Sequence, residues 1–358
     1  MDGEEAIDRV LKVLHCEDLF GTLEGTAEEK RRHLQTAYRE LAQLVHPDKH
    51  PRIAHRAQEA FVALTRLKEI AERKIRAGTY GDRRPPPDAR PPTVITTPTT
   101  TYRVGEMLFA GDVCDHYTCT FEDKTGVLKI ARSPADDDLV ENEANVLGVL
   151  YPRNAADEKF RRYLPRLVDS FRMRSDAGTL RRVVLLPSFG PWSTLEDIQQ
   201  VYPRGLDFRD VVWMFKRMLV GLGWVHQQGY VHGAIVPPHV LVHPVHHGAR
   251  IMDWGYAVKI GEKVRARVKR FADLYAPEIA AKEPATPASD IYMAARIARS
   301  MLDKDAPARL LTFLSTLTVQ QPKRRPDDAW RVHEELDELL LRLVGKPKYR
   351  PLAMPAKA

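Results

Sequence analysis

The stretch YVHGAIVPPHVLVHPVHHGARIMDWG, residues 230–255, joins a loop with two adjacent prolines to an expected hairpin and ends in Asp-Trp-Gly. The hairpin is expected because two apolar runs flank the polar turn HPVHHG. Between His232 and His239 the loop is glycine, proline and apolar residues. The stretch therefore has the outline of a site between secondary-structure elements, but it carries few side chains that could do chemistry.

Short motifs on both sides of this stretch follow one another in a fixed order over residues 102–342. They are VLKIA, ENEANVL, LLPSFG at 185–190, then MDWGYA, YAPEIAA, SDIYMAAR and RRPDDA. The residues that they single out are Lys129, Glu143, Asp253, Glu278, Asp290 and Arg325. In this order and spacing the motifs resemble those of the protein kinases.

The resemblance implies an α+β bilobal kinase-like fold with a cleft between a β-rich and an α-rich lobe. In that family a strand lysine pairs with a helix glutamate, which here are Lys129 and Glu143, a better register than Glu141. Asp253 stands where the family has its metal-binding carboxylate, and Gly255 keeps the glycine of that motif.

Four further positions carry structural roles in the family. His232 is retained in the loop, and Asp290 is expected to anchor that loop. Glu278 is expected to form an ion pair with Arg325.

The side chains that perform the chemistry in protein kinases are replaced here. Gly233 stands for the loop arginine, Ala234 for the catalytic aspartate, Val236 for the lysine and His239 for the asparagine. A positioned base contributes on the order of 10²- to 10⁴-fold in rate, and metals and cationic groups supply most of the rest in phosphoryl transfer. We therefore expect no kinase activity.

The phosphate-binding loop is also altered. The three glycines of the family fall on Phe109, Gly111 and Cys114, so only one position keeps the freedom that lets backbone N–H groups approach a phosphate. Asp112 and Asp115 add negative charge there.

ATP and Mg²⁺ are still expected as possible structural ligands, held by Lys129, Glu143, Asp253 and Gly111, with Asp253 as the magnesium ligand. The alternative is that Lys129 and Glu143 form an ordinary pair on the surface. No serine or threonine lies between Gly255 and Tyr275, so the usual acceptor for an activating phosphate is missing.

A helical pattern with the sequence HPD precedes this region. Thr26 and Glu29 form a capping box, apolar residues then recur at helical spacing up to Val45, and a second helix with its own apolar stripe follows residues 46–52. Two antiparallel helices around the HPD turn are expected, with an extra helix over residues 7–14.

Residues 16–81 resemble a J-domain of the DnaJ family through TAYRELAQLVHPDKH and YG at 80–81. The family docks on a DnaK-type chaperone and stimulates its ATPase. This implies chaperone binding by His46, Pro47, Asp48, Arg32 and Arg39. Pro47 fixes the turn, and a positive helix face steers association with an acidic partner. The alternative is that HPD is only a turn between two packed helices of a bundle.

The predicted domains are a J-domain over 1–83, a linker over 84–101, the kinase-like domain over 102–342 and a basic tail over 343–358. The linker contains six prolines and six threonines, which disfavour a helix.

The charge of +7 lies partly in KIGEKVRARVKR, residues 259–270, with six basic residues and one acid. This run is either solvated or receives an acidic partner or protein client, and nucleic-acid binding is not favoured because no aromatic residues are interleaved. Three cysteines and no long apolar run favour a cytoplasmic protein with reduced thiols and no membrane span. The histidines of HPVHHG do not predict a metal site.

These observations favour a J-domain co-chaperone or adaptor whose pseudokinase domain binds a partner or client. Two alternatives remain open at this point. One is an active transferase that uses Mg·ATP through Asp253 and Lys129, and the other is a nucleic-acid-associated protein.

Overall fold

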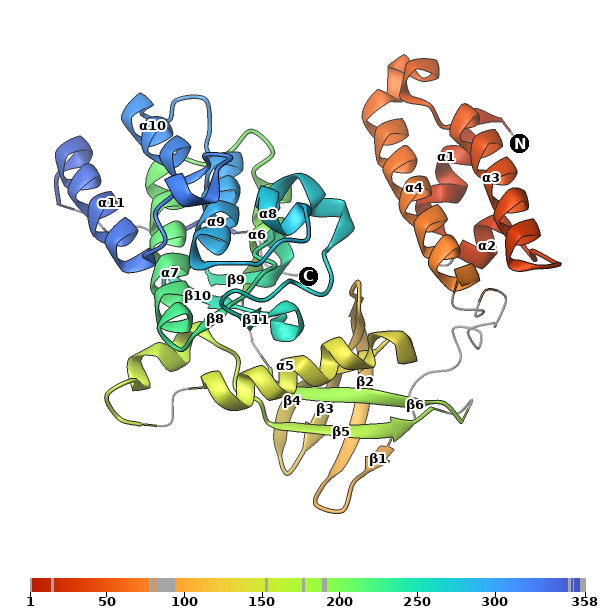
Figure 1. Cartoon of the computed structure of the whole chain (residues 1–358), viewed down its shortest axis with the longest axis horizontal. Helices are drawn as coiled ribbons and strands as arrows, with labels where there is room; N and C mark the ends of the chain where they lie inside the picture. The colour runs from red at the N-terminus through yellow and green to blue at the C-terminus, as the bar shows by residue number, and fades with distance from the viewer. Residues whose placement is uncertain are drawn as a thin grey trace. The chain divides into compact units, whose positions relative to one another are not determined.

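The computed structural model in Figure 1 contains two compact units, residues 1–89 and 90–358. It describes residues 2–13, 16–76, 80, 94–151, 154–175, 178–188, 192–346, 349 and 351–354. Residues 84–93 of the predicted linker and residues 189–190 of LLPSFG lie outside these ranges. Each unit has its own hydrophobic core.

The first unit consists of helices. Its α-helices are α1 (Gly3–Lys12), α2 (Cys16–Phe20), α3 (Ala27–Leu44) and α4 (Ala54–Arg76). Helix α3 begins at the predicted capping box, in which Thr26 and Glu29 each accept from the other's backbone N–H. The apolar stripes of α1, α3 and α4 meet in one core, where Ile7, Leu34 and Leu64 are almost fully buried.

Two short 3₁₀ turns connect α3 to α4, η1 (Pro47–Lys49) and η2 (Pro51–Ile53). A proline begins each turn because its fixed φ suits a first helical position and its missing N–H costs nothing there. The Tyr38 hydroxyl lies 3.2 Å from the Thr65 hydroxyl, which ties the two helices together. The predicted helical hairpin around residues 46–48 is therefore present.

The second unit begins with a six-stranded antiparallel sheet in the order β1-β2-β3-β4-β6-β5. Its strands are β1 (Val94–Thr96), β2 (Thr101–Ala110), β3 (Cys114–Phe121), β4 (Lys124–Ala131), β5 (Asp169–Arg174) and β6 (Leu180–Pro187). Helix α5 (Asp137–Leu150) lies along this sheet (Figure 1). Buried Val140 and Leu147 on α5 share a core with Val184 and Leu186 of β6.

Helices build the rest of this unit. They are α6 (Leu195–Val201), α7 (Phe208–Gln227), α8 (Pro277–Ala280), α9 (Pro287–Met301), α10 (Ala308–Leu317) and α11 (Ala329–Val344). Five short strands lie among them, β7 (Ser193–Thr194), β8 (Tyr230–Val231), β9 (Val240–His243), β10 (Gly248–Ile251) and β11 (Val258–Lys259). The predicted hairpin is the β9–β10 pair, in which Ile251 is the partner of Val240.

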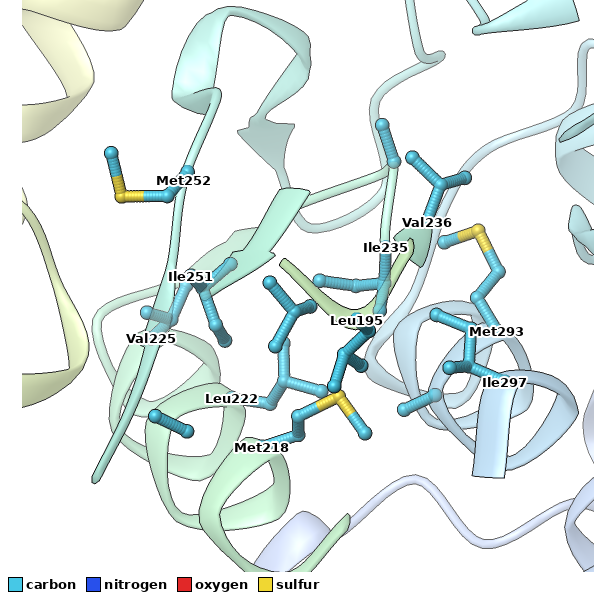
Figure 2. Close-up of a cluster of buried hydrophobic side chains, with 14 of the residues drawn as sticks. Leu195, Met218, Leu222, Val225, Ile235, Val236, Ile251, Met252, Met293 and Ile297 are labelled. Carbon is cyan, nitrogen blue, oxygen red and sulfur yellow. The ribbon is translucent and has the colours of Figure 1, made fainter. Parts of the chain in front are cut away.

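The core of this helical part packs around α7. Figure 2 shows Met218, Leu222 and Val225 of α7 grouped with Ile235 and Val236 of the loop before β9. The apolar residues of that loop are thus part of the hydrophobic core.

Two predicted boundaries differ from the structure. Residues 94–96 belong to the sheet as β1, because Val94–Thr96 pair with Thr101–Arg103, so the predicted linker ends earlier. The tail after residue 342 is not simply a basic extension. Helix α11 continues to Val344, and Leu352 is buried in the core and donates its N–H to the carbonyl of Pro244.

No helix among the described residues is both long and apolar enough to cross a membrane.

Candidate functional site

A buried cluster of three charged residues joins the sheet, α5 and the turn after β10. The Lys129 ammonium on β4 lies 2.8 and 2.6 Å from the two carboxylate oxygens of Glu143 on α5. It also lies 2.6 Å from Oδ1 of Asp253. Lys129 and Glu143 are almost fully buried, so this is not a surface pair. Glu141, the register not chosen, pairs with Arg182 instead.

Lys129 and Asp253 hold one another ionised, whereas burial raises the pKa of Glu143 above its ordinary value even beside Lys129. Burial alone would lower the pKa of Lys129, but the adjacent Asp253 and Glu143 carboxylates raise it above its ordinary value. Burial would likewise raise the pKa of Asp253, but Lys129, followed by two histidines, holds it well below its usual range. The ion pair of Lys129 with Asp253 is therefore the stable part of this cluster.

Backbone geometry fixes Asp253 in place. Asp253 has φ +63° and ψ 54°, a left-handed conformation that aspartate tolerates better than most residues. A side chain at Gly255 would come within 2.6 Å of the carbonyl of Leu139 on α5. The Asn142 amide donates to the carbonyls of Gly255 and Ala257, both at 2.9 Å. Helix α5 therefore carries Glu143 and also holds the segment after Asp253 in place.

Asp290 at the start of α9 organises the loop of residues 232–239. Its carboxylate accepts from the backbone N–H of His232 at 2.8 Å and of Gly233 at 2.9 Å. His226 Nε2 donates to the same carboxylate at 3.0 Å. His232 in turn donates from Nε2 to the carbonyl of Met252 at 2.7 Å, which links the loop to Asp253.

Two positions at which protein kinases have catalytic polar groups are buried and apolar here. Ala234 and Val236 are 0% exposed. His239 donates from Nδ1 to the carbonyl of Ala234 at 2.9 Å, and its Nε2 lies 3.8 Å from Asp253 Oδ2. Tyr256 stacks on the His239 ring at 5.4 Å. The loop therefore presents no carboxylate to accept a proton from a substrate hydroxyl.

Val264, in the segment after Asp253, packs against Gly233, the position at which the family has the loop arginine. Gly233 has φ +72°, and a Cβ built on it would lie 2.7 Å from a methyl group of Val264. In kinases whose activation loops are ordered by phosphorylation, arginines bind the phosphate. Here an apolar side chain packs against a glycine, so this contact needs no phosphate.

The hairpin between β2 and β3 is closed by its own contacts. Arg132 donates to the Gly111 carbonyl at 2.6 Å and pairs with Asp115 at 3.1 Å, which balances one of the acidic charges of the loop. A Cβ on Gly111 would lie 2.8 Å from the Cys114 carbonyl. Cys114 is buried in the main core, so a packed side chain occupies the third glycine position of the family.

His116 lies on β3 of this hairpin, and the sequence analysis did not single it out. Its ring stacks on Phe109 at 4.0 Å, and it is only 8% exposed. Burial, together with Lys129, lowers its pKa to about 3, so the ring is neutral at physiological pH. Its Nδ1 has no hydrogen-bond partner among the described residues. The signal that could have indicated His116 is the expected pairing of its strand with the strand of Lys129. In that pair His116 is the direct partner of Lys129.

The expected magnesium ligand in this site is the carboxylate of Asp253. Magnesium prefers oxygen ligands, and the second ligand position is the imidazole of His239. One Asp253 oxygen is held by Lys129. Among the described residues, no group of three or more His, Cys, Asp or Glu side chains is placed to hold a metal ion.

The remaining predicted pair supports the helical lobe. Glu278 lies 2.6 Å from Arg325 and also accepts from the Ser289 hydroxyl at 2.6 Å. All three residues are buried, which places this pair in the framework away from solvent.

The side chains of His46 and Asp48 in the HPD turn of the first unit are accessible to solvent. The side chains of His46 and Asp48 are 46% and 89% exposed. The His46 ring contacts Phe61 edge-on at 5.6 Å, and its Nδ1 accepts from the Asp48 N–H at 3.3 Å. Arg32 and Arg39 are exposed on α3, and no carboxylate within the described ranges pairs with them.

Comparison with known proteins shows the fold of the second unit. No protein-family profile matches the chain. A solved structure of vaccinia related kinase 3 resembles it with a TM-score of 0.60 at 15% sequence identity, over 74% of this chain and 95% of that chain. Because the first unit ends at residue 89, a match of this extent lies mostly in the second unit. The predicted kinase-like fold is thereby confirmed, and at this identity the likeness says nothing of activity.

Proposed function

We propose that this protein is a J-domain co-chaperone or adaptor, in which the first unit stimulates a DnaK-type chaperone ATPase and the kinase-like unit binds a partner or client without transferring phosphate. The observation that carries the first half is the exposed His46-Pro47-Asp48 turn beside the unpaired cations Arg32 and Arg39. The proposal assigns the protein to the cytoplasm, where its free thiols stay reduced.

The chemistry of the turn suits a docking role. Asp48 is almost fully exposed, so its carboxylate is available to a partner's hydrogen-bond donors. Arg32 and Arg39 are two helical turns apart on one face of α3, where they attract an acidic surface. The His46 ring rests on Phe61, which keeps the turn at the end of the helical hairpin.

The test is the ATP turnover of a purified DnaK-type chaperone with and without the full chain. We expect stimulation by the wild-type chain and a loss of roughly tenfold or more with His46→Gln, since one interface hot spot contributes about 2 kcal/mol. Arg32→Glu and Arg39→Glu should weaken stimulation more at low salt than at high salt. The matched control is Arg31→Glu, another exposed cation of α3. Equal stimulation by wild-type and His46→Gln chains would overturn the proposal.

The second half of the proposal is carried by the loop of residues 232–239. Ala234 has no exposed surface, and Val236 packs into the core shown in Figure 2. Restoring activity would thus need a rebuilt loop as well as a restored aspartate. These features support a scaffold role for the kinase-like unit.

A second candidate function is phosphoryl or nucleotidyl transfer from Mg·ATP, favoured by the Lys129–Glu143–Asp253 cluster. For this reaction the contact between Lys129 and Asp253 would open, so that Asp253 could bind a metal ion and Lys129 could contact the phosphates. If ATP binds but no group is transferred, ATP would be a structural ligand. The test follows label from the α- and γ-phosphates of ATP into protein or product, with Asp253→Asn as the control. Label transfer that disappears in Asp253→Asn would establish this candidate, and the first proposal predicts no transfer.

A further inference from the structure

The segment after β11 alternates between buried apolar and exposed basic residues. In the sequence KVRARVK, residues 263–269, the side chains of Val264, Ala266 and Val268 are partly or fully buried. The intervening Lys263, Arg265, Arg267 and Lys269 are exposed. The apolar residues hold the segment on the helical lobe, with Val264 against Gly233. The cations are therefore presented outward from a fixed backbone.

Some cations in and next to this segment have no carboxylate partner among the described residues. Arg270 pairs with Glu196 through a contact of 2.8 Å, so the end of the segment is neutralised. Within the described part of the chain, no carboxylate pairs with the side chains of Lys259, Lys263 or Arg265. Unpaired cations that lie close together repel one another, and an anionic ligand relieves that repulsion.

A groove of about 240 Å³ runs beside the same cations. Val146 and Val149 of α5 and Tyr230 of β8 line its apolar side, and Lys259 and Arg265 line it on the side of the basic segment. Val149 is 65% exposed, so its side chain is available to a ligand. The groove therefore combines an apolar surface with two cations.

The walls of the groove are held rigidly. Strand β11 pairs with β8, in the register Lys259 with Tyr230. The N–H of Ile260 donates to the Gly229 carbonyl at 2.9 Å, and Gly261 donates to Ala285 at 2.9 Å. A ligand would thus meet a preorganised surface and would pay little for ordering it.

We propose that this groove and the adjoining row of cations bind an acidic peptide segment of a partner protein, with one apolar side chain placed against Val149 and carboxylates facing Lys259, Lys263 and Arg265. The proposal deepens the partner-binding role suggested above and rests on it. A peptide fits better than a nucleic acid, because an apolar side chain of a peptide can pack against the valine wall of the groove. A phosphate backbone would gain nothing from that wall.

The experiment measures fluorescence anisotropy of two labelled twelve-residue peptides with the full chain. One alternates glutamate with neutral residues around a central leucine, and the other replaces every glutamate with lysine. We expect saturable binding of the acidic peptide alone, weakened by salt. Val149→Glu and the Lys259→Glu/Arg265→Glu double variant should each weaken it by about tenfold or more, since like charges across an interface cost several kcal/mol.

The control variants separate this proposal from others. Lys304→Glu changes an exposed cation outside the groove and should leave binding unchanged. His46→Gln should also leave it unchanged, so failure of the chaperone assay and failure here can be told apart. Val149 and Arg265 are exposed, so the variants should keep the thermal unfolding temperature of the wild-type chain.

Three outcomes would overturn the proposal. They are no binding of the acidic peptide, binding that the groove variants leave intact, and tighter binding of a labelled oligothymidylate that the same charge reversals abolish. The last outcome would point to a nucleic-acid surface instead.

Discussion

Two histidine-led loops of this protein have opposite surroundings. The loop His46-Pro47-Asp48 is open to solvent, and its aspartate is 89% exposed. The loop His232-Gly233-Ala234 is buried, and two of its backbone N–H groups, those of His232 and Gly233, donate to Asp290. Polar groups that have no internal use remain available to another molecule, whereas groups that are fully paired inside serve the fold. Under the proposed function, the first loop serves recognition, whereas the second loop supports the fold.

The largest expected effect comes from removing the anchor of the buried loop. Asp290→Ala would leave two buried N–H groups and His226 without their acceptor, which should reduce the free energy of unfolding by about 3–5 kcal/mol. The measurement is chemical denaturation of the full chain, followed by tryptophan fluorescence, since all five tryptophans lie in the kinase-like unit. Asp290→Asn should lose less because it keeps one acceptor. A loss under about 1 kcal/mol for Asp290→Ala would contradict the structural role.

Restoring the family arginine at Gly233 is the next test. Gly233→Arg should destabilise the unit by about 2–4 kcal/mol, because a side chain at φ +72° is strained and Val264 occupies its space. Adding Val264→Ala should recover only the steric part. The same denaturation assay measures both, with Gly229→Ala as a control for the φ effect alone, because Gly229 has φ +82° and no atoms near its Cβ position. Equal losses for Gly233→Ala and Gly229→Ala would mean that the Val264 contact is unimportant.

Acid should weaken the kinase-like unit through His116. Burial lowers the pKa of His116 to about 3 from its ordinary 6.5, so the unfolded chain takes up a proton at a higher pH than the folded chain. The neutral His116 ring therefore makes its full contribution to the free energy of unfolding above pH 6.5. This contribution is lost as the pH falls toward 3, and about 2 kcal/mol of it is already lost at pH 5. His116→Leu should therefore lose less stability than wild type between pH 7 and 5. Parallel losses in the two proteins would show that His116 does not stay neutral.

The smallest effect on stability belongs to the exposed loop. Asp48→Ala should change the free energy of unfolding of the first unit by no more than about 0.5 kcal/mol, because the side chain is exposed. Circular dichroism at the helix band during thermal unfolding measures this change. The same variant should abolish stimulation of the chaperone. A large loss of stability would place Asp48 with the structural residues and remove the contrast between the loops.

Motifs with local signals could be read from the sequence. The capping box at Thr26, the hairpin around residues 240–251 and the strand with Lys129 each depend on neighbouring residues. The partner of Lys129 on α5 could also be chosen, because Glu143 lies on the buried face of the helix and Glu141 does not.

Contacts between segments that are far apart in the sequence could not be predicted from local patterns. The contact of Lys129 with Asp253 crosses 124 positions, and no local pattern indicates that the lysine holds both carboxylates. The burial of Leu352 and the strand at 94–96 depend on what the tail and the linker meet in space. The alternation in residues 263–269 was visible, but the glycine against which Val264 packs was known only from the fold.

The most direct test of the central claim is ATP turnover in one mixture of the full chain, Mg²⁺ and a DnaK-type chaperone. The wild-type chain is compared with His46→Gln and with Asp253→Asn, each also measured without the chaperone. We predict turnover above that of the chaperone alone that is lost in His46→Gln and kept in Asp253→Asn. Turnover lost in Asp253→Asn and kept in His46→Gln would contradict the account, because the buried loop would then support chemistry and the exposed loop would not be needed.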